Sequence, residues 1–244
     1  MAFQYLNRDK EVRVFDSDPD RVHGLAQAVS FEKAVAAQLV LLCIPISDME
    51  EACRKMAPLL GSGQIVVDTC SVKRRPIDWM AAHLPESVQI LGTHPLFGPD
   101  SAKEGIEGLT IALCPVRIQP EMYADIRGYL KRLQLNVVEP TPDDHDEQLA
   151  RGQAVFHLIA QAMKRLEWAG QAISTPGPEA FYRLVETVRH DTDQLFHDME
   201  RENPYAAQFR KRFIQEVLTL DQELSEEAEQ MASLEKRQTT DPGP

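Results

Sequence analysis

The feature that most constrains the fold is an alternation of short β-branched runs with amphipathic stretches, which ends near residue 141. Each run has the length of a strand and is bounded by turn or polar residues. This alternation predicts βα units and a largely parallel, doubly wound sheet. The predicted strands are 11–16, 39–43, 64–68, 88–92, 110–113 and 135–138, and the predicted helices between them are 19–28, 31–37, 47–59, 73–83 and 120–133.

Beyond residue 142 the sequence carries helical spacing and no further strand signal. Between His145 and Gly170, apolar residues recur at intervals of three and four, which predicts one long helix with a buried face. Two more long helices are predicted at 179–199 and 204–234. Three such helices carry more apolar surface than each can bury by itself. We therefore expect this half of the chain to form a homodimer.

These patterns predict two domains and a tail. Residues 1–141 are expected to form a dinucleotide-binding-like α/β domain, and residues 142–235 an all-helical domain for substrate binding and dimerisation. Residues 236–244 are polar, contain Pro-Gly-Pro and are expected to be disordered. The predicted fold class is therefore α/β, with an incomplete, Rossmann-like parallel sheet followed by helices.

Charge and hydropathy exclude several partners. The chain has 26 Lys and Arg against 38 Asp and Glu, a net charge of −12 at pH 7, so it has no excess of cations to neutralise nucleic acid or an anionic membrane. No apolar run approaches the ~18 residues that span a bilayer, and the opening residues lack the pattern of a signal peptide. We expect a cytoplasmic protein without nucleic-acid or membrane partners.

The cysteines give no sign of a metal site or of a disulfide framework. They show neither a C-x-x-C spacing nor a histidine arrangement suited to zinc, and we expect reduced, mostly buried thiols at Cys43, Cys53, Cys70 and Cys114. The pairs His145-Asp146 and His190-Asp191 resemble those of metal phosphohydrolases, but further ligands at suitable spacing are missing. We therefore predict no metal.

Polar segments leave the carboxyl ends of several predicted strands, where ligands of doubly wound folds bind. Asp16 ends the predicted strand at 11–16. In a dinucleotide-binding fold, an acid at the end of the second strand accepts hydrogen bonds from the ribose hydroxyls and selects NAD. A turn-forming role fits Asp16 equally well. Pro45 lies in a stiff turn after the run at 39–43. The segments 68–73 and 92–100 should converge on one crevice. His94 is the only histidine there, either a functional group or a loop histidine.

Four motifs, in order, resemble those of the prephenate dehydrogenase family, the dehydrogenases of tyrosine biosynthesis. The resemblance runs from about residue 12 to about residue 224. The motifs are D-x-x-S-V-K at 68–73, G-x-H-P-x-F-G-P-D at 92–100, H-D at 145–146 with a second histidine at 157, and F-Y-R-L at 181–184.

The resemblance implies a role for each matching residue. His94 would bind the ring hydroxyl of the substrate and accept its proton as hydride leaves the same carbon. Ser71 would orient His94 and the nicotinamide of NAD, with Asp16 and Pro45 as further cofactor contacts. The substrate-binding residues implied are Arg183, whose fork suits a carboxylate, together with Lys73, Asp100, Gln153 and His157.

The implied activity is the NAD-dependent oxidative decarboxylation of prephenate to 4-hydroxyphenylpyruvate. A neutral imidazole can relieve the positive charge that develops on oxygen, and loss of CO2 aromatises the product. Arogenate and an amino-deoxyprephenate remain open as substrates, since the sequence does not separate them from prephenate.

One family feature is missing from the sequence. The family fold begins with a strand and a G-x-G-x-x-G turn, whereas the first glycine here is Gly24 and residues 2–6 resemble the remainder of the following helix. Either the chain starts late, or a natural homologue has lost dinucleotide binding and binds prephenate-like dianions as a dimer. We expect residues before about 35 to be poorly ordered and these 244 residues to bind NAD poorly.

Overall fold

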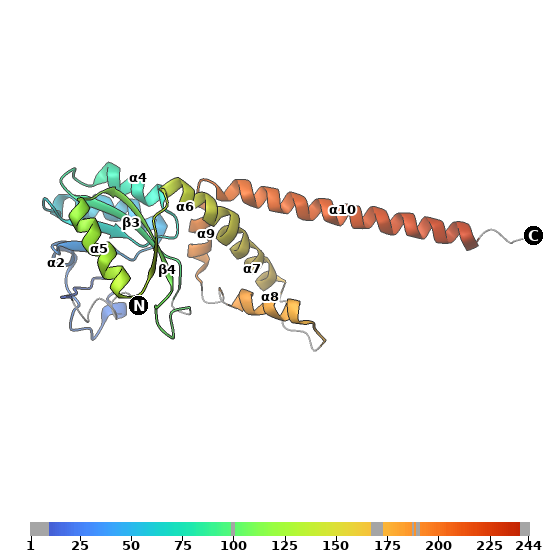
Figure 1. Cartoon of the computed structure of the whole chain (residues 1–244), viewed down its shortest axis with the longest axis horizontal. Helices are drawn as coiled ribbons and strands as arrows, with labels where there is room; N and C mark the ends of the chain where they lie inside the picture. The colour runs from blue at the N-terminus through green and yellow to red at the C-terminus, as the bar shows by residue number, and fades with distance from the viewer. Residues whose placement is uncertain (1–9, 99–100, 167–172, 187, 189–190, 240–244) are drawn as a thin grey trace, which may run out of the picture.

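The first half of the chain forms one five-stranded sheet in a computed structural model that describes residues 10–98, 101–166, 173–186, 188 and 191–239 (Figure 1). The strands are ordered β1-β2-β3-β4-β5. The β1–β2, β2–β3 and β4–β5 pairs are parallel, and the β3–β4 pair is antiparallel. The strands are β1 (Leu39–Leu42), β2 (Ile65–Asp68), β3 (Gln89–Pro95), β4 (Thr110–Arg117) and β5 (Asn136–Val138).

Five of the six predicted strands are confirmed, but the direction of β4 differs from a purely parallel sheet. A parallel connection needs a crossover, usually a helix, whereas antiparallel neighbours do not. No helix was predicted between β3 and β4, and the described residues of that connection form none. The chain therefore turns back, and β4 runs against β3.

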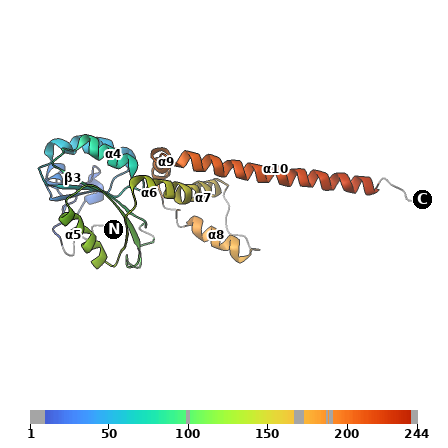
Figure 2. The same ribbon diagram turned by 45° about the horizontal axis from the view of Figure 1, so that its top comes forward.

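Helices cover both faces of the sheet, as Figure 2 shows for α4 (Arg74–His83) on one side and α5 (Pro120–Arg132) on the other. One core lies between the sheet and α4, α3 (Met49–Met56) and α2 (Phe31–Val35). The other lies between the sheet and α5. Neighbouring residues of one strand belong to opposite cores, as Val66 and Val67 of β2 do, because strand side chains alternate between faces.

The predictions for residues 11–28 are wrong. Val14 forms only an isolated bridge with Ala28, so 11–16 is not a strand of the sheet. The predicted helix at 19–28 is a short 3-10 helix, η1 (Pro19–Val22), and Gly24 just beyond it has a φ of 79° that no helix continues. Residues 1–9, including the predicted helix remnant at 2–6, lie outside the described residues.

The second half of the described chain is helical. The single helix predicted between 145 and 170 is divided into three consecutive elements. These are α6 (Pro142–Leu149), a π-helical turn η4 (Ala150–Ala154) and α7 (Val155–Arg165). The helix predicted at 179–199 is divided into α8 (Pro176–Glu186) and α9 (Asp193–Glu202), because Thr192 accepts from the Leu195 backbone N–H and starts a new helix.

The last helix, α10 (Ala206–Thr239), extends far from the rest of the molecule (Figure 1). It continues through the first residues of the predicted disordered tail, and residues 240–244 lie outside the described part. No helix of the described residues combines the length and the apolar character needed to cross a membrane. Cys43 is exposed and the other three cysteines are buried, all with free thiols, as predicted.

Gly92 allows α4 to lie close to β3 and provides a test of this packing. A Cβ at residue 92 would lie 2.8 Å from Ile77 Cδ1, 3.2 Å from Ile77 Cγ1 and 3.4 Å from Cys114 Cβ, so a rotation of the Ile77 tip alone does not make room. We expect Gly92→Ala to lower the free energy of unfolding by about 1–3 kcal/mol. Gly128 of α5 is the control, since a Cβ there meets only Arg132 Nη1 at 3.7 Å and alanine favours a helix. Urea unfolding should show loss for Gly92→Ala and no loss for Gly128→Ala; equal stabilities would contradict the packing.

Candidate active site

The carboxylate of Asp146, on α6, joins the helical domain to the sheet domain. It is fully buried and accepts hydrogen bonds from the backbone N–H groups of Lys73 (2.7 Å) and Arg74 (2.8 Å). These N–H groups lie at the start of α4, where a helix presents unpaired donors and a partial positive charge. The Asn203 side chain also donates to the Asp146 carbonyl (2.9 Å). Asp146 is thereby held from both domains.

Two histidines continue from this carboxylate toward the carboxyl end of the sheet. His145 Nδ1 lies 2.8 Å from Asp146 Oδ1, and His145 Nε2 lies 3.0 Å from His94 Nδ1. His94 comes from the end of β3 and is 6% exposed, while His145 is 3% exposed. The predicted histidine is therefore part of a buried Asp–His–His chain that the helical domain completes.

Burial controls the protonation of His94. Burial lowers the pKa of His94 well below its ordinary value, and the neighbouring His145 and the cation of Lys73 lower it further. The His94 imidazole is therefore neutral at neutral pH, which is the form that can accept a proton. Burial also lowers the pKa of His157, although Asp191, 3.7 Å away, opposes this effect.

Lys73 is fully buried and paired inside the protein. Its ammonium group forms an ion pair with Asp68 at the end of β2 and donates to the Thr93 carbonyl in β3. Thr93 Oγ1 in turn donates to the Asp68 carbonyl. The cation has no solvent-exposed surface, and it fixes the two strand ends beside His94. The expected substrate contact of Lys73 stays a prediction.

Ser71 follows β2 and has a buried hydroxyl. Its Oγ makes no hydrogen bond to any residue that the structure describes, and it makes none to His94. A buried polar group without a partner is costly, so such a hydroxyl suits a site in which a bound molecule supplies the partner. Asp68 Oδ2 likewise has no partner within the described chain.

Gln153 and His157 lie on either side of the junction between η4 and α7. Gln153 is half-buried within the π-helical turn, and His157 is buried in α7. The structure does not bring either one into hydrogen bonding with His94 within the described residues. π-helical turns are rare and occur often at functional sites, and the predicted regular helix missed this one.

The other predicted residues are more scattered. Arg183 is exposed on α8, which packs against α7 and lies apart from the sheet in both views (Figures 1 and 2). Asp16 Oδ1 accepts from the Asp18 N–H (2.9 Å), as a turn-forming aspartate does. Pro45 precedes the 3-10 helix η2 (Ile46–Asp48) after β1. Asp100 lies outside the described residues.

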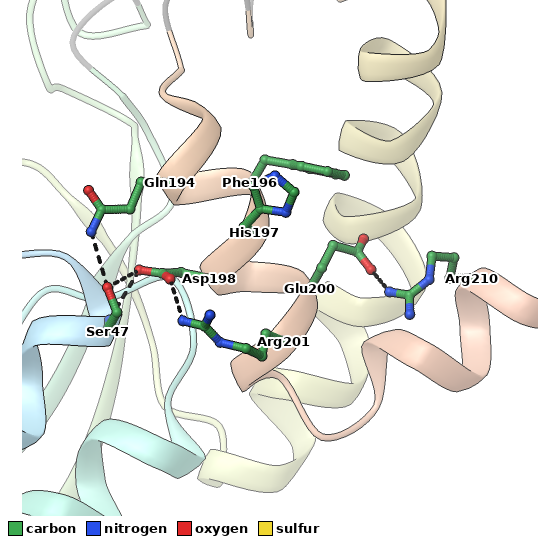
Figure 3. Close-up of a pocket in the computed structure, with 8 residues that line it drawn as sticks. All are labelled: Ser47, Gln194, Phe196, His197, Asp198, Glu200, Arg201 and Arg210. Atoms are coloured by element: carbon green, nitrogen blue, oxygen red, sulfur yellow. Dashed lines mark hydrogen bonds and ion pairs between the residues drawn. The ribbon is translucent and has the colours of Figure 1, made fainter.

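A second tie between the domains was not predicted from the sequence. The Ser47 backbone N–H and hydroxyl donate to Asp198 Oδ2 at 3.1 and 2.9 Å, and Gln194 donates to the Ser47 hydroxyl (Figure 3). Arg201 pairs with Asp198 Oδ1. These side chains line a cavity of about 880 Å³ between η2, α9 and the start of α10. Residues 151 positions apart meet here, which no local pattern reveals.

The fold and site define a class: an α/β protein in which side chains from a Rossmann-like sheet and from the helical second half of the chain meet. Among the described residues, no group of His, Cys, Asp or Glu could hold a metal ion. Residues 8–139 match the family described as "Prephenate dehydrogenase, nucleotide-binding domain". The chain therefore belongs to the prephenate dehydrogenase family.

Relatives agree with this assignment. The chain is 30% identical over 180 residues to "Arogenate dehydrogenase 2, chloroplastic" of Arabidopsis thaliana, covering 71% of this chain and 50% of the relative. It is 28% identical over 200 residues to "4-amino-4-deoxyprephenate dehydrogenase" of Streptomyces pristinaespiralis, covering 77% and 64%. The chain thus spans half of the Arabidopsis relative's length.

The fold is also that of a solved structure. The prephenate dehydrogenase of Aquifex aeolicus, solved in complex with hydroxyphenyl propionate and NAD+, has a TM-score of 0.71 to this chain, with 16% identity, covering 98% of this chain and 90% of that one. At this identity the likeness concerns the fold, which is the predicted Rossmann-like class.

The buried neutral histidines predict a loss of stability in acid. Below the ordinary histidine pKa of ~6.5 the unfolded chain takes up protons, whereas the folded chain holds His94 and His157 neutral until a lower pH. The free energy of unfolding should therefore fall as the pH drops from about 7.5 to 5. Urea unfolding across this range should show a smaller fall for His94→Gln and His157→Gln, and an unchanged fall for the exposed His23→Gln. If the free energy of unfolding of His94→Gln fell with pH as steeply as that of the wild type, this would contradict a neutral, buried His94 imidazole.

Proposed function

We propose that this protein is an NAD-dependent dehydrogenase that oxidatively decarboxylates prephenate to 4-hydroxyphenylpyruvate in tyrosine biosynthesis. The observation that carries the proposal is a buried, neutral histidine at the carboxyl end of the sheet, with Nδ1 bonded to His145. Family membership supports the reaction class. The expected cytoplasmic location stays a prediction.

In this proposal His94 is the general base. Its Nε2 accepts the proton of the ring hydroxyl as hydride leaves the same carbon, which relieves the positive charge on oxygen. NAD, when bound, supplies the hydride acceptor. The ring carboxylate then leaves as CO2, its electron pair completes the aromatic ring, and the oxygen regains a proton from His94. Proton, hydride and carboxylate are thereby all accounted for.

The described residues fit the nicotinamide end of a dinucleotide site. The buried Ser71 hydroxyl lacks a partner and follows β2, and Pro45 follows the adjacent strand β1 at the same edge of the sheet. Asp16 is proposed to contact the adenosine ribose. The 244 residues contain no G-x-G-x-x-G turn for the pyrophosphate, so a homologue that only binds prephenate-like dianions remains the alternative.

The substrate dianion needs a cation, because the chain has a net charge of −12. We assign this role to Arg183, whose planar fork can hold a carboxylate through two hydrogen bonds. Arg183 lies on α8, and this helix packs against α7 through Tyr182, Val185 and Phe156. His157 belongs to α7. Gln153, His157 and Asp100 are proposed as further substrate contacts.

Three relatives give a specific reason for a second candidate substrate. Relatives in Arabidopsis thaliana are named arogenate dehydrogenases, and the Streptomyces relative is named for amino-deoxyprephenate. Arogenate, prephenate and amino-deoxyprephenate share the carboxylated ring that His94 would act on. Prephenate and arogenate also share the ring hydroxyl, whereas 4-amino-4-deoxyprephenate carries an amine at that carbon, so His94 would accept a proton from N–H there; assays with each substrate decide between the three.

Replacing His94 tests the reaction. With saturating NAD, His94→Asn should lower kcat by ~10²–10⁴ while KM stays within a few-fold, the range for a lost general base. His83, the last residue of α4, pairs with Glu50 of α3 and gives the control His83→Ala, expected to keep full activity. Turnover of His94→Asn within threefold of wild type would remove His94 from the mechanism. A wild-type chain that turns over none of the three substrates but binds prephenate in calorimetry would favour the binding-only alternative.

We also propose that α10 pairs with α10 of a second copy. Its exposed apolar residues have the alternating three- and four-residue spacing of a coiled-coil seam, at Val217, Leu220, Leu224 and Met231, and these are 48–66% exposed. The expected homodimer thus acquires a specific surface.

A charge within this seam should separate the copies. Leu224→Glu places two carboxylates in the proposed interface, so we expect a monomer in sedimentation velocity at concentrations where the wild type is a dimer. Ser225→Glu adds the same charge on the outer face of α10 and should leave the dimer intact. A dimeric Leu224→Glu variant would contradict pairing through α10.

A further inference from the structure

The hydrogen bonds around His94 determine which of its nitrogens carries the proton. Asp146 already accepts two backbone N–H groups, and a carboxylate in this role has no proton to donate. The nitrogen of His145 that faces it, Nδ1, must therefore be the protonated one. In a neutral ring this leaves His145 Nε2 as an acceptor, so the facing His94 Nδ1 is the donor.

We propose that His145 and Asp146 are positioning residues that hold His94 in the tautomer with Nδ1 protonated and Nε2 free. Only the catalytic role of this tautomer rests on the proposed function, because the tautomer itself is a property of the free protein. Nε2 is the nitrogen that a general base needs, and the opposite tautomer would present an N–H to the substrate hydroxyl. The helical domain thus makes the base of the sheet domain competent.

The chain also stabilises the charged form that appears during reaction. When His94 Nε2 accepts a proton, the new charge lies in a buried site, where burial and the Lys73 cation both oppose it. Lys73 is itself paired with Asp68, and the Asp146 carboxylate faces the new cation through His145. Hydrogen-bonded carboxylates orient catalytic imidazoles and stabilise the imidazolium in this way. The proton stays on His94 until the oxygen takes it back as the ring carboxylate leaves.

A purely structural role is the competing explanation, since Asp146 also caps the start of α4. Changes at Asp146 therefore risk unfolding the helix, whereas changes at His145 leave both of its backbone contacts in place. His145→Phe removes the acceptor for His94 Nδ1. His145→Gln restores it, because the amide oxygen can accept from His94 while the amide nitrogen donates to Asp146.

The first measurement is independent of activity. Nitrogen NMR of histidine-labelled protein distinguishes protonated from unprotonated ring nitrogens. We expect His94 in the wild type to have Nδ1 protonated and Nε2 unprotonated, His145→Phe to give a mixture of tautomers, and His145→Gln to restore the single form. Asp143→Asn is the matched control. Asp143 is an acid of α6 that contacts Arg74 at 2.7 Å but takes no part in the hydrogen bonds that join Asp146, His145 and His94. It should leave the tautomer unchanged.

The second measurement is kinetic. His145→Phe should lower kcat by about 10²-fold or more with KM within about twofold, and His145→Gln should recover most of the loss. A wild-type His94 with Nε2 protonated would overturn the inference, as would a His145→Phe variant that loses activity with its tautomer unchanged. The predicted tautomer in a chain that turns over no substrate would support the positioning role and overturn the proposed dehydrogenase activity instead.

Discussion

The rest of the structure depends on one buried carboxylate. Asp146 accepts the N–H groups of Lys73 and Arg74, and these contacts fix the start of α4 to the first helix of the second domain. A buried charge is tolerated only when hydrogen bonds replace its water, and two backbone donors at a helix start supply them. Because His145 is the neighbouring residue, the same contact also places an imidazole against the end of β3. Domain orientation and site geometry therefore share one cause.

The ends of β2 and β3 are fixed by a second buried interaction, between Lys73 and Asp68. The ammonium also binds the Thr93 carbonyl, next to His94, so one side chain joins three backbone segments beside that histidine. An ion pair of this kind does little for stability, because desolvation offsets the attraction. Its value lies in position: it holds the strand ends and disfavours protonation of His94. The Ser47–Asp198 contact holds the loop after β1 in a similar manner.

Sequence patterns predicted the strands of the sheet and identified His94 at the centre of the site, but they did not predict the hydrogen-bond partners of His94. Burial periodicity is local, so it identified β1 to β5 and the helices that cover them. His94 followed from its place after a strand. The pair His145-Asp146 was visible as a motif, yet its meeting with His94 spans 51 positions and depends on how α6 packs against α4. The burial of Lys73 and its ion pair with Asp68 were likewise not visible in the sequence, where the family resemblance implied only a place in the site.

The sequence by itself determined the α/β class, the change to helices after residue 141, the family motifs and the absence of a glycine-rich turn, because each is a property of neighbouring residues. The tertiary structure alone decided that β4 runs antiparallel, that 11–16 lies outside the sheet, and that Asp146, His145 and His94 form one chain. A strand needs a partner to pair with, and a hydrogen bond needs two groups brought within about 3 Å, so both depend on how distant segments pack.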